Sequence, residues 1–344
     1  GQVYRDLIEK ERRGDFLGET VQYIPHVPNE ITSRIYDIGR EHEIVLIEIG
    51  GTVGDYENVP FLFAAKNMEN KLGKENVCYL LVTYMPIPSH IEEMKTKPTQ
   101  LAIKLLRENG IQPDFILCRG KNELDDIRRK KIEQYSHIPS ENIISMPDVT
   151  GAGTVNTLYA VPLFLEKEQM GRKLLSALHI EQKKQPDWEE WSSLVEKLVH
   201  PSRTIEIAVI GKYLATGNYT MRDSYLSISE ALQHAGSFHN ARVNINWVAA
   251  QEIIQKRIDL SKFDGILVPG GFGNSGVEGK LSAVQFARER AVPYLGLCFG
   301  LQLAVVEFAQ HVCNLDAHSS EINPNVKHKV VDILPEQQSL TEKG

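Results

Sequence analysis

Residues 293–302 read PYLGLCFGLQ, and this stretch decides the fold of the second half of the chain. PYLGLC predicts a strand, and the segment after it, FGLQLAVVEFAQHV, repeats apolar residues at helical spacing. Gly296 and Gly300 flank Cys298 in the pattern of a nucleophile elbow, a sharp turn from strand to helix that pushes one side chain out above a sheet. The N-terminus of a helix also favours a thiolate. We therefore expect Cys298 to be a nucleophile rather than a buried apolar cysteine.

A nucleophile of this kind needs hydrogen-bond donors for the oxygen that becomes negative, and a base for its own proton. The amide of Phe299 is one expected donor, and the glycine-rich run 270–273, at the end of a strand predicted over 263–273, is expected to supply another. Three histidines follow the cysteine in the sequence: His311, His318 and His328. None is assigned as the base, because none is followed by an acidic residue at the spacing of a catalytic partner. Cys313 lacks the elbow context and is expected to be inert.

Strands alternate with helices along the rest of the chain. Apolar runs predict strands over 43–49, 77–85, 113–120, 142–149, 205–213 and 241–250. Helix starts or helical spacing lie between them, over 96–109, 128–135 and 223–236. This alternation predicts the α/β class with two doubly wound parallel sheets, in which ligands bind at the carboxyl ends of the strands.

The chain changes character between residues 164 and 202. This segment is charged, has apolar residues at helical spacing, and carries Pro186 and Pro201. We expect a helical linker over 164–202 between a first domain, 1–163, and a second domain, 203–344. Trp188 and Trp191 are expected to pack on one of these domains, with a tryptophan-lined ligand site as the alternative.

Composition agrees with two globular domains. The 344 residues are 42% hydrophobic and carry a net charge of −7, which argues against global disorder and against a general polyanion binder. No apolar run reaches the roughly 18–20 residues that a membrane span needs. The first residues lack the apolar core of a signal peptide, and the four cysteines form no CxxC pair, so we expect free thiols in a cytoplasmic protein.

Polar residues gather at predicted strand ends in the first half. Glu48 precedes a glycine pair, where it could hold Mg²⁺ or accept hydrogen bonds from its own loop. Asp55 and Glu57 follow on that loop, as acceptors for a base or ribose or as a solvated turn. KTKPTQ (95–100) places cations at a helix N-terminus and indicates an anion site, with ordinary surface lysines as the alternative. The basic run 128–131 is typical of a solvated helix face.

Together these segments resemble the CTP synthase family of glutamine-hydrolysing amidoligases. The resemblance covers nearly the whole chain and is carried by KERRGDFLGETVQYIPH (10–26), EIGGTVGDYE (48–57), KTKPTQ (95–100), IQPDFILCR (111–119), LVPGGFGNSGVEG (267–279) and PYLGLCFGLQ (293–302). The last two motifs are shared with the wider class I glutamine amidotransferases. The resemblance implies a P-loop-type amidoligase domain, a helical linker and a class I glutamine amidotransferase domain, in a cytoplasmic homotetramer. It further implies that ATP phosphorylates the 4-oxygen of UTP, and that ammonia from glutamine passes through an internal channel and displaces the phosphate to give CTP.

The resemblance also implies roles for individual residues. Glu48 would bind Mg²⁺, Asp148 and Val149 would contact ATP, and Cys298 would form the glutamyl thioester. UTP, or CTP as feedback inhibitor, would contact Asp55, Tyr56, Glu57, Lys95, Thr96, Lys97, Pro98, Thr99, Gln100 and Lys131. Glutamine would be held by Gly271, which completes the oxyanion hole, and by Phe299, Gly300, Leu301, Gln302 and Glu321. GTP is the implied activator, and neither nucleic acid nor a membrane is an expected partner.

The chain departs from the family pattern at both ends. The family begins with a Walker-type phosphate loop, yet no GxxxxGK[ST] occurs in these 344 residues. The glutaminase histidine and glutamate of the family lie beyond residue 344, and Pro147 stands where a more polar ATP contact is expected. We therefore expect these residues alone to make little or no CTP. Two alternatives stay open: a free-standing glutamine amidotransferase, against which KTKPTQ and EIGG argue, and an inert copy that binds nucleotide or joins oligomers.

Overall fold

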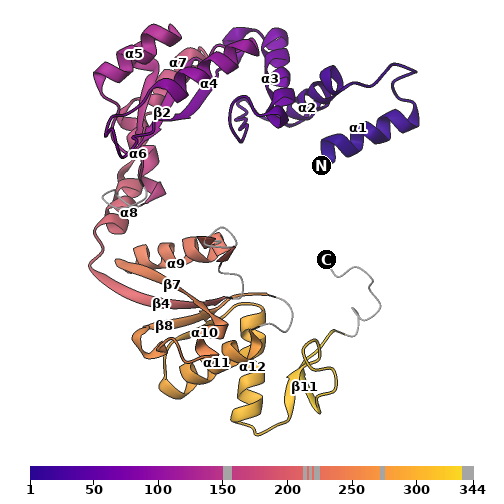
Figure 1. Ribbon diagram of the computed structural model, residues 1–344, viewed down its shortest axis with the longest axis vertical. Coiled ribbons are helices and arrows are strands. Elements are labelled where there is room, and N and C mark those ends of the chain that lie inside the picture. Colours follow the sequence, from indigo (N-terminus) through magenta and orange to yellow (C-terminus); the bar gives the residue numbers. More distant parts are fainter. Residues whose placement is uncertain (150–156, 212–214, 217–218, 221–224, 272–275, 335–344) are drawn as a thin grey trace. The chain divides into compact units, whose positions relative to one another are not determined.

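The computed structural model describes residues 1–149, 157–211, 215–216, 219–220, 225–271 and 276–334. The chain divides into two compact units, 1–192 and 193–344, each with its own parallel sheet (Figure 1). The division falls within the segment 164–202, where a helical linker is expected. No helix in the described part of the chain is both long and apolar enough to cross a bilayer.

The sheet of the first unit has three parallel strands in the order β1-β2-β3. They are β1 (Leu80–Tyr84), β2 (Phe115–Gly120) and β3 (Ile143–Pro147), connected by α4 (Lys97–Glu108) and α5 (Asp126–Ser136). All five elements overlap the predicted ones. The helices α4 and α5 pack on one face of the sheet around the fully buried Ile103, Ile116 and Ile132. On the other face, α6 (Val161–Lys167) and α7 (Met170–Ala177) cover β2 and β3.

Three helices precede this sheet: α1 (Gln2–Arg13), α2 (Tyr23–Gly39) and α3 (Val59–Leu72). They share a smaller apolar core that contains Leu7, Val27 and Ala64. Glu30 on α2 accepts hydrogen bonds from Lys10 on α1 and from Arg34 one turn away. The short helices η1 (Tyr56–Asn58), η2 (Lys74–Asn76), η3 (Ser140–Asn142) and η4 (Leu158–Ala160) complete the first unit.

The prediction of a buried strand over 43–49 is wrong. These residues form no strand, and Ile44, Leu46 and Ile47 are exposed, with Leu46 at 93%. Val45 and Ile49 are only partly buried, and Ile49 packs against the core of the first unit. A parallel strand is stabilised by a hydrogen-bonded neighbour and by packing on both faces. In the described part of the chain β1 pairs with β2 alone, so this apolar run has no strand partner. An apolar run in a sequence does not reveal whether that partner exists.

The second unit is built on a parallel sheet of four strands in the order β7-β4-β8-β9. They are β4 (Arg203–Gly211), β7 (Ala241–Ala249), β8 (Gly265–Val268) and β9 (Tyr294–Gly296). The helices are α9 (Leu226–Phe238), α10 (Ala250–Ile254), α11 (Val277–Arg290) and α12 (Phe299–His311), with η6 (Leu260–Lys262). The second unit also has two small strand pairs: β5 (Ala215–Thr216) with β6 (Tyr219–Thr220), and β10 (Ala317–Ser319) with β11 (His328–Val331). The chain winds from β4 to one neighbour and then to the other, so the sheet is doubly wound, as predicted.

The two nearby tryptophans lie where the units divide. Trp191 is on α8 (Glu189–Val199), and its indole N–H donates to the carbonyl of Tyr159 at 2.7 Å while the two rings pack 5.8 Å apart. Trp188 immediately precedes the helix. These contacts favour the expected packing role of Trp191 over a ligand site.

Candidate functional site

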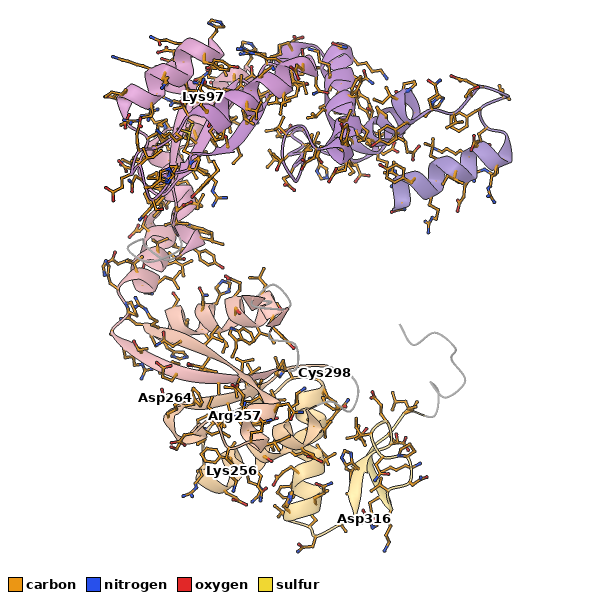
Figure 2. The ribbon with its side chains drawn as sticks, in the orientation of Figure 1. Lys97, Lys256, Arg257, Asp264, Cys298 and Asp316 are labelled. Carbon is orange, nitrogen blue, oxygen red and sulfur yellow. The ribbon has the colours of Figure 1, made fainter. Side chains whose placement is uncertain are left out.

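Cys298 lies at the junction of β9 and α12, where it is the N-cap residue of the helix (Figure 2). Cys298 is exposed to solvent, and its backbone has φ 52° and ψ −107°. A non-glycine residue with positive φ costs roughly 1–3 kcal/mol and persists only where its surroundings impose it. The strand, the strained turn and the helix are those of the predicted elbow.

Two glycines allow the turn to close. A Cβ atom on Gly300 would lie 2.0 Å from the carbonyl oxygen of Val268, and one on Gly296 would lie 2.5 Å from the backbone of Gly300. Neither distance is physically possible for a carbon atom. The Tyr294 hydroxyl donates to the Gly300 carbonyl at 2.8 Å, and the Leu297 amide donates to that of Val268 at 2.9 Å. The spacing GxCxG is therefore a packing requirement as well as a sequence motif.

The loop after β8 approaches this turn. A Cβ atom on Gly270 would lie 3.4 Å from the Cβ atom of Cys298 and 3.9 Å from its Sγ atom, so Gly270 brings backbone close to the thiol. Phe299 begins α12, and its amide has no partner four residues earlier within the helix. Gly271 is next to the Lys280 ammonium, which is buried and lies 5.2 Å from the centre of the Phe299 ring. Residues 272 and 273 of the expected loop lie outside the described residues.

Of the other residues assigned to glutamine, Leu301 and Gln302 lie in the first turn of α12 and Glu321 follows β10. The Gln302 amide donates to the Cys298 carbonyl at 3.1 Å, and the side chain of Leu301 is 59% exposed. Glu321 is exposed after β10, with its amide bonded to the Ser319 hydroxyl at 3.3 Å.

Among the histidines after Cys298, the side chains of His311 and His318 have partners of their own. His311 contacts Glu307 at 3.3 Å on the same helix, and His318 accepts a hydrogen bond from the Ser319 amide through Nδ1. Burial lowers the pKa of His318, which favours its neutral form. These contacts do not identify a base for the thiol, as the sequence also does not.

The second cluster is a basic hollow at the carboxyl end of β1 in the first unit. It has a volume of about 220 Å³ and is lined by Glu93, Met94, Lys95, Thr96, Lys97, Ile127, Arg128 and Lys131. We call this the basic hollow. It joins the start of α4 to the first turns of α5, so the structure brings together Lys95, Lys97 and Lys131, which are assigned to one nucleotide (Figure 2, where Lys97 is labelled). The N-terminus of α4 adds its positive dipole end to these cations.

The remaining residues of KTKPTQ hold the helix in place. The Thr99 hydroxyl is fully buried 3.1 Å from the Thr83 hydroxyl on β1, and the Gln100 amide contacts the Thr96 hydroxyl at 3.4 Å. Pro98 is exposed in the first turn of α4. The side chains of Thr99 and Gln100 therefore face the protein interior rather than the basic hollow.

The acidic residues expected at a metal or at the base or ribose of a nucleotide form no metal cluster in the described residues. Glu48 is exposed in the segment that is not a strand, and no group of three or more His, Cys, Asp or Glu side chains forms a metal site in the described ranges. Asp55 accepts a hydrogen bond from the Thr52 amide at 3.0 Å, beside the exposed Tyr56 and Glu57, which is the geometry of a solvated turn. A single carboxylate such as Glu48 does not make a Mg²⁺ site.

The residues assigned to ATP follow β3. The Asp148 carboxylate is 3.5 Å from the Arg119 guanidinium, and Val149 is buried. A larger hollow of about 370 Å³ lies at the opposite, amino-terminal end of the strands, between Lys74, Cys78 and Asp114. It contains none of the predicted site residues, and a large volume alone does not indicate a functional site.

Two charged residues of the basic hollow, Glu93 and Arg128, have no role in the sequence-based assignment. Glu93 and Arg128 form an ion pair across it at 2.9 Å. The run 128–131 is also more than a solvated face, because Arg128 and Arg129 are partly buried and Arg129 donates to the carbonyl oxygens of Ser140 and Ile143. No local pattern marks Glu93, because it meets Arg128 only through folding.

Comparison with known proteins gives matches to both units. The family model for the N-terminus of CTP synthase matches residues 1–180, and the model for class I glutamine amidotransferase matches residues 220–341. The curated CTP synthase of Thermococcus gammatolerans is 46% identical over 346 residues, and that of Methanococcus maripaludis is 43% identical over 352 residues. Each match covers all of this chain.

The chain spans 63% and 64% of the length of these two relatives, and 61% of the CTP synthase of Acaryochloris marina, which is 44% identical. A solved structure described as the glutaminase domain of Trypanosoma brucei CTPS with bound acivicin is 37% identical over 39% of this chain and 52% of its own, with a TM-score of 0.36. The N-terminal match over more than half of the chain does not fit a free-standing amidotransferase. The chain belongs to the CTP synthase family.

Proposed function

We propose that this chain supplies the glutamine-cleaving nucleophile and the pyrimidine nucleotide site of a CTP synthase. The observation that carries the proposal is the exposed Cys298 at a strained elbow, beside the glycine loop that follows β8. The protein would use UTP, ATP and glutamine, with Mg²⁺, GTP as activator and CTP as inhibitor, as a cytoplasmic homotetramer. The synthase domain would comprise 1–163 and the amidotransferase domain 203–344.

In the second unit, the Cys298 sulfur would attack the carboxamide carbon of glutamine. The carbonyl oxygen would become negative between the amides of Phe299 and Gly271, which are fixed before the reaction and therefore need no reorganisation. The proton that the thiol gives up would be transferred to the nitrogen, and collapse of the adduct would break the C–N bond, releasing ammonia and leaving a glutamyl thioester. Water would then cleave the thioester to glutamate.

In the first unit, the basic hollow would hold the phosphates of UTP. Cations from two elements converge there, and the binding of a polyanion would relieve the repulsion among them. ATP would phosphorylate the 4-oxygen of the pyrimidine, and ammonia would displace that phosphate. Glu48 is the proposed Mg²⁺ ligand, but it belongs to no group of three or more His, Cys, Asp or Glu side chains in the described residues, so no step is derived through the metal.

A diazoketone analogue of glutamine tests the nucleophile on the 344-residue chain. We expect the analogue to alkylate Cys298, as located by peptide mass spectrometry, and glutamine to slow the labelling. Cys298→Ala should abolish the label. Cys313 is a matched control because it is also exposed in the same unit, and Cys313→Ala should leave the labelling unchanged.

Iodoacetamide, which lacks the α-amino and α-carboxylate groups of glutamine, separates recognition of the amino acid from simple exposure of the thiol. It should modify both Cys298 and Cys313, and glutamine should slow its reaction with Cys298 alone. Equal labelling of the two cysteines by the glutamine analogue would contradict a glutamine site at the elbow.

A further inference from the structure

Glu93 divides its carboxylate between cations that come from two different elements. It lies in the loop between β1 and α4, and its Oε2 accepts a hydrogen bond from Lys95 Nζ at 2.6 Å. Its Oε1 accepts one from Arg128 Nη2, in the first turn of α5, at 2.9 Å. The bonds from Lys95 and then Arg128 lower the pKa of Glu93, so the carboxylate is ionised at neutral pH.

The surroundings of Glu93 are otherwise cationic. Four basic side chains line the basic hollow, and Glu93 is the one acid among the residues that line it in the described part of the chain. Its two oxygens therefore occupy the place, between two cations, that oxygens of a phosphate group would take. The side chain of Glu93 is 47% exposed, so it has room to turn toward solvent.

The backbone and a neighbour hold this arrangement in place. Glu92 has a left-handed backbone, with φ 56°, and its amide donates to the Pro88 carbonyl at 2.9 Å, which fixes the loop ahead of Glu93. Arg128 Nη1 donates to the Asp125 carboxylate at 2.8 Å. Asp125 thus anchors one side of the guanidinium, while the nitrogen on the other side is available to exchange partners.

We propose that Arg128 is a phosphate-binding residue of the basic hollow and that Glu93 is an internal competitor for it. The inference rests on the proposed function, in which this hollow holds the triphosphate of a nucleotide. On binding, Lys95 and Arg128 transfer their hydrogen bonds from the carboxylate to phosphate oxygens, and Glu93 turns outward. A planar guanidinium can donate two parallel hydrogen bonds to a phosphate, which an ammonium cannot.

This exchange sets a threshold for binding. A ligand with one weakly charged group offers little more than the carboxylate already supplies. A triphosphate presents several charges and can satisfy Lys95, Lys97, Arg128 and Lys131 together. Glu93 therefore lowers the affinity of the hollow for every anion and leaves only multiply charged ligands able to enter.

Isothermal titration of the 344-residue chain with inorganic tripolyphosphate, and separately with UTP, tests the proposal. Because exposed ion pairs are individually weak, we expect Glu93→Gln to tighten tripolyphosphate binding about 3- to 10-fold. Arg128→Gln should weaken it about 10-fold, as loss of a charge-assisted hydrogen bond does. Glu108→Gln is the matched control, because it removes an exposed carboxylate from the far end of α4, and it should change affinity by less than about 2-fold.

The double variant tests the coupling. Since Arg128 must release Glu93 before it binds a phosphate in the wild-type chain, Arg128→Gln should cost more affinity in the Glu93→Gln background than alone. Circular dichroism and thermal unfolding check that each variant folds.

The outcomes separate the inference from the function beneath it. Wild-type binding with no gain in Glu93→Gln overturns the competitor role, and wild-type binding with no loss in Arg128→Gln overturns the phosphate role. If folded wild-type chain binds neither tripolyphosphate nor UTP, the nucleotide site itself is wrong, and the inference fails with it.

Discussion

At the scale of single residues, the free cysteines show how strongly position governs chemistry. Cys298 stands exposed at the tip of a turn, whereas Cys118 is buried within β2 and Cys78 is half-buried just before β1. Burial raises the pKa of Cys118 to about 12 and that of Cys78 to about 11. These two thiols therefore stay protonated and unreactive in the folded chain near neutral pH.

The buried thiol of Cys118 makes stability depend on alkaline pH. Its folded pKa of about 12 lies above the ordinary value of 9.0, so its contribution is complete below pH 9 and is lost as the pH rises toward 12, where the unfolded chain binds fewer protons. Between about pH 8.5 and about pH 10.5, we expect wild-type chain to lose about 2 kcal/mol more of its free energy of unfolding than Cys118→Ala. Urea unfolding at both pH values measures the difference.

Comparing how the free energy of unfolding changes with pH in wild type and in Cys118→Ala also controls for other groups that titrate in this range. Tyr79 and Tyr294 have pKa values raised mainly by burial, and both are present in wild type and variant alike. Identical pH slopes for the two proteins would show that Cys118 is not buried as described.

At the scale of elements, the elbow depends on how closely α12 approaches β8. Gly300→Ala would place a methyl group 2.0 Å from the Val268 carbonyl oxygen, so helix and strand must separate. We expect this change to cost roughly 1–3 kcal/mol of stability, the usual range for overpacking, and to reduce labelling of Cys298 by the glutamine analogue. Chemical unfolding and the labelling rate report the two effects.

Gly171→Ala provides the reference for this substitution. Gly171 lies in α7 with nothing within 4 Å of an added Cβ atom, so the same change there should stabilise the chain by about 0.4–1 kcal/mol and leave labelling unchanged. A Gly300→Ala variant as stable as wild type would mean that α12 does not pack on β8 as the structure has it.

The success of prediction also differs between elements for a physical reason. The elbow and its flanking strand and helix were predictable, because glycine spacing and apolar periodicity are properties of neighbouring residues. The segment 43–49 was not, because its apolar run is compatible with a strand only if another strand adjoins it. The meeting of Glu93 with Arg128 was likewise unpredictable, since 35 positions separate them and only the packing of α4 and α5 brings them together.

At the scale of the whole molecule, each unit has a core of its own. The first is built around residues such as Ile116 and Ile132, and the second around residues such as Ile210 and Ile266. We expect two thermal transitions in calorimetry. Tripolyphosphate should raise the transition temperature of the first unit only. Alkylation by the diazoketone analogue of glutamine should shift the transition temperature of the second unit only, because a ligand stabilises the fold that binds it.

Tryptophan fluorescence assigns the two transitions. Trp188 and Trp191 belong to the first unit, and Trp247 on β7 belongs to the second. Trp247→Phe should remove the fluorescence change of one transition and keep that of the other. A single transition that both ligands shift equally would show that the units unfold together.

The outer side of β1 has a practical consequence for anyone who handles this chain. In the described residues β1 is an edge strand whose Leu80, Val82 and Tyr84 are 41%, 58% and 53% exposed. An edge that offers free amide and carbonyl groups beside apolar side chains is a template on which another polypeptide can add a strand. Concentrated preparations will therefore tend to self-associate and precipitate along this edge, and dilute, cold and freshly prepared samples are the ones in which to measure binding.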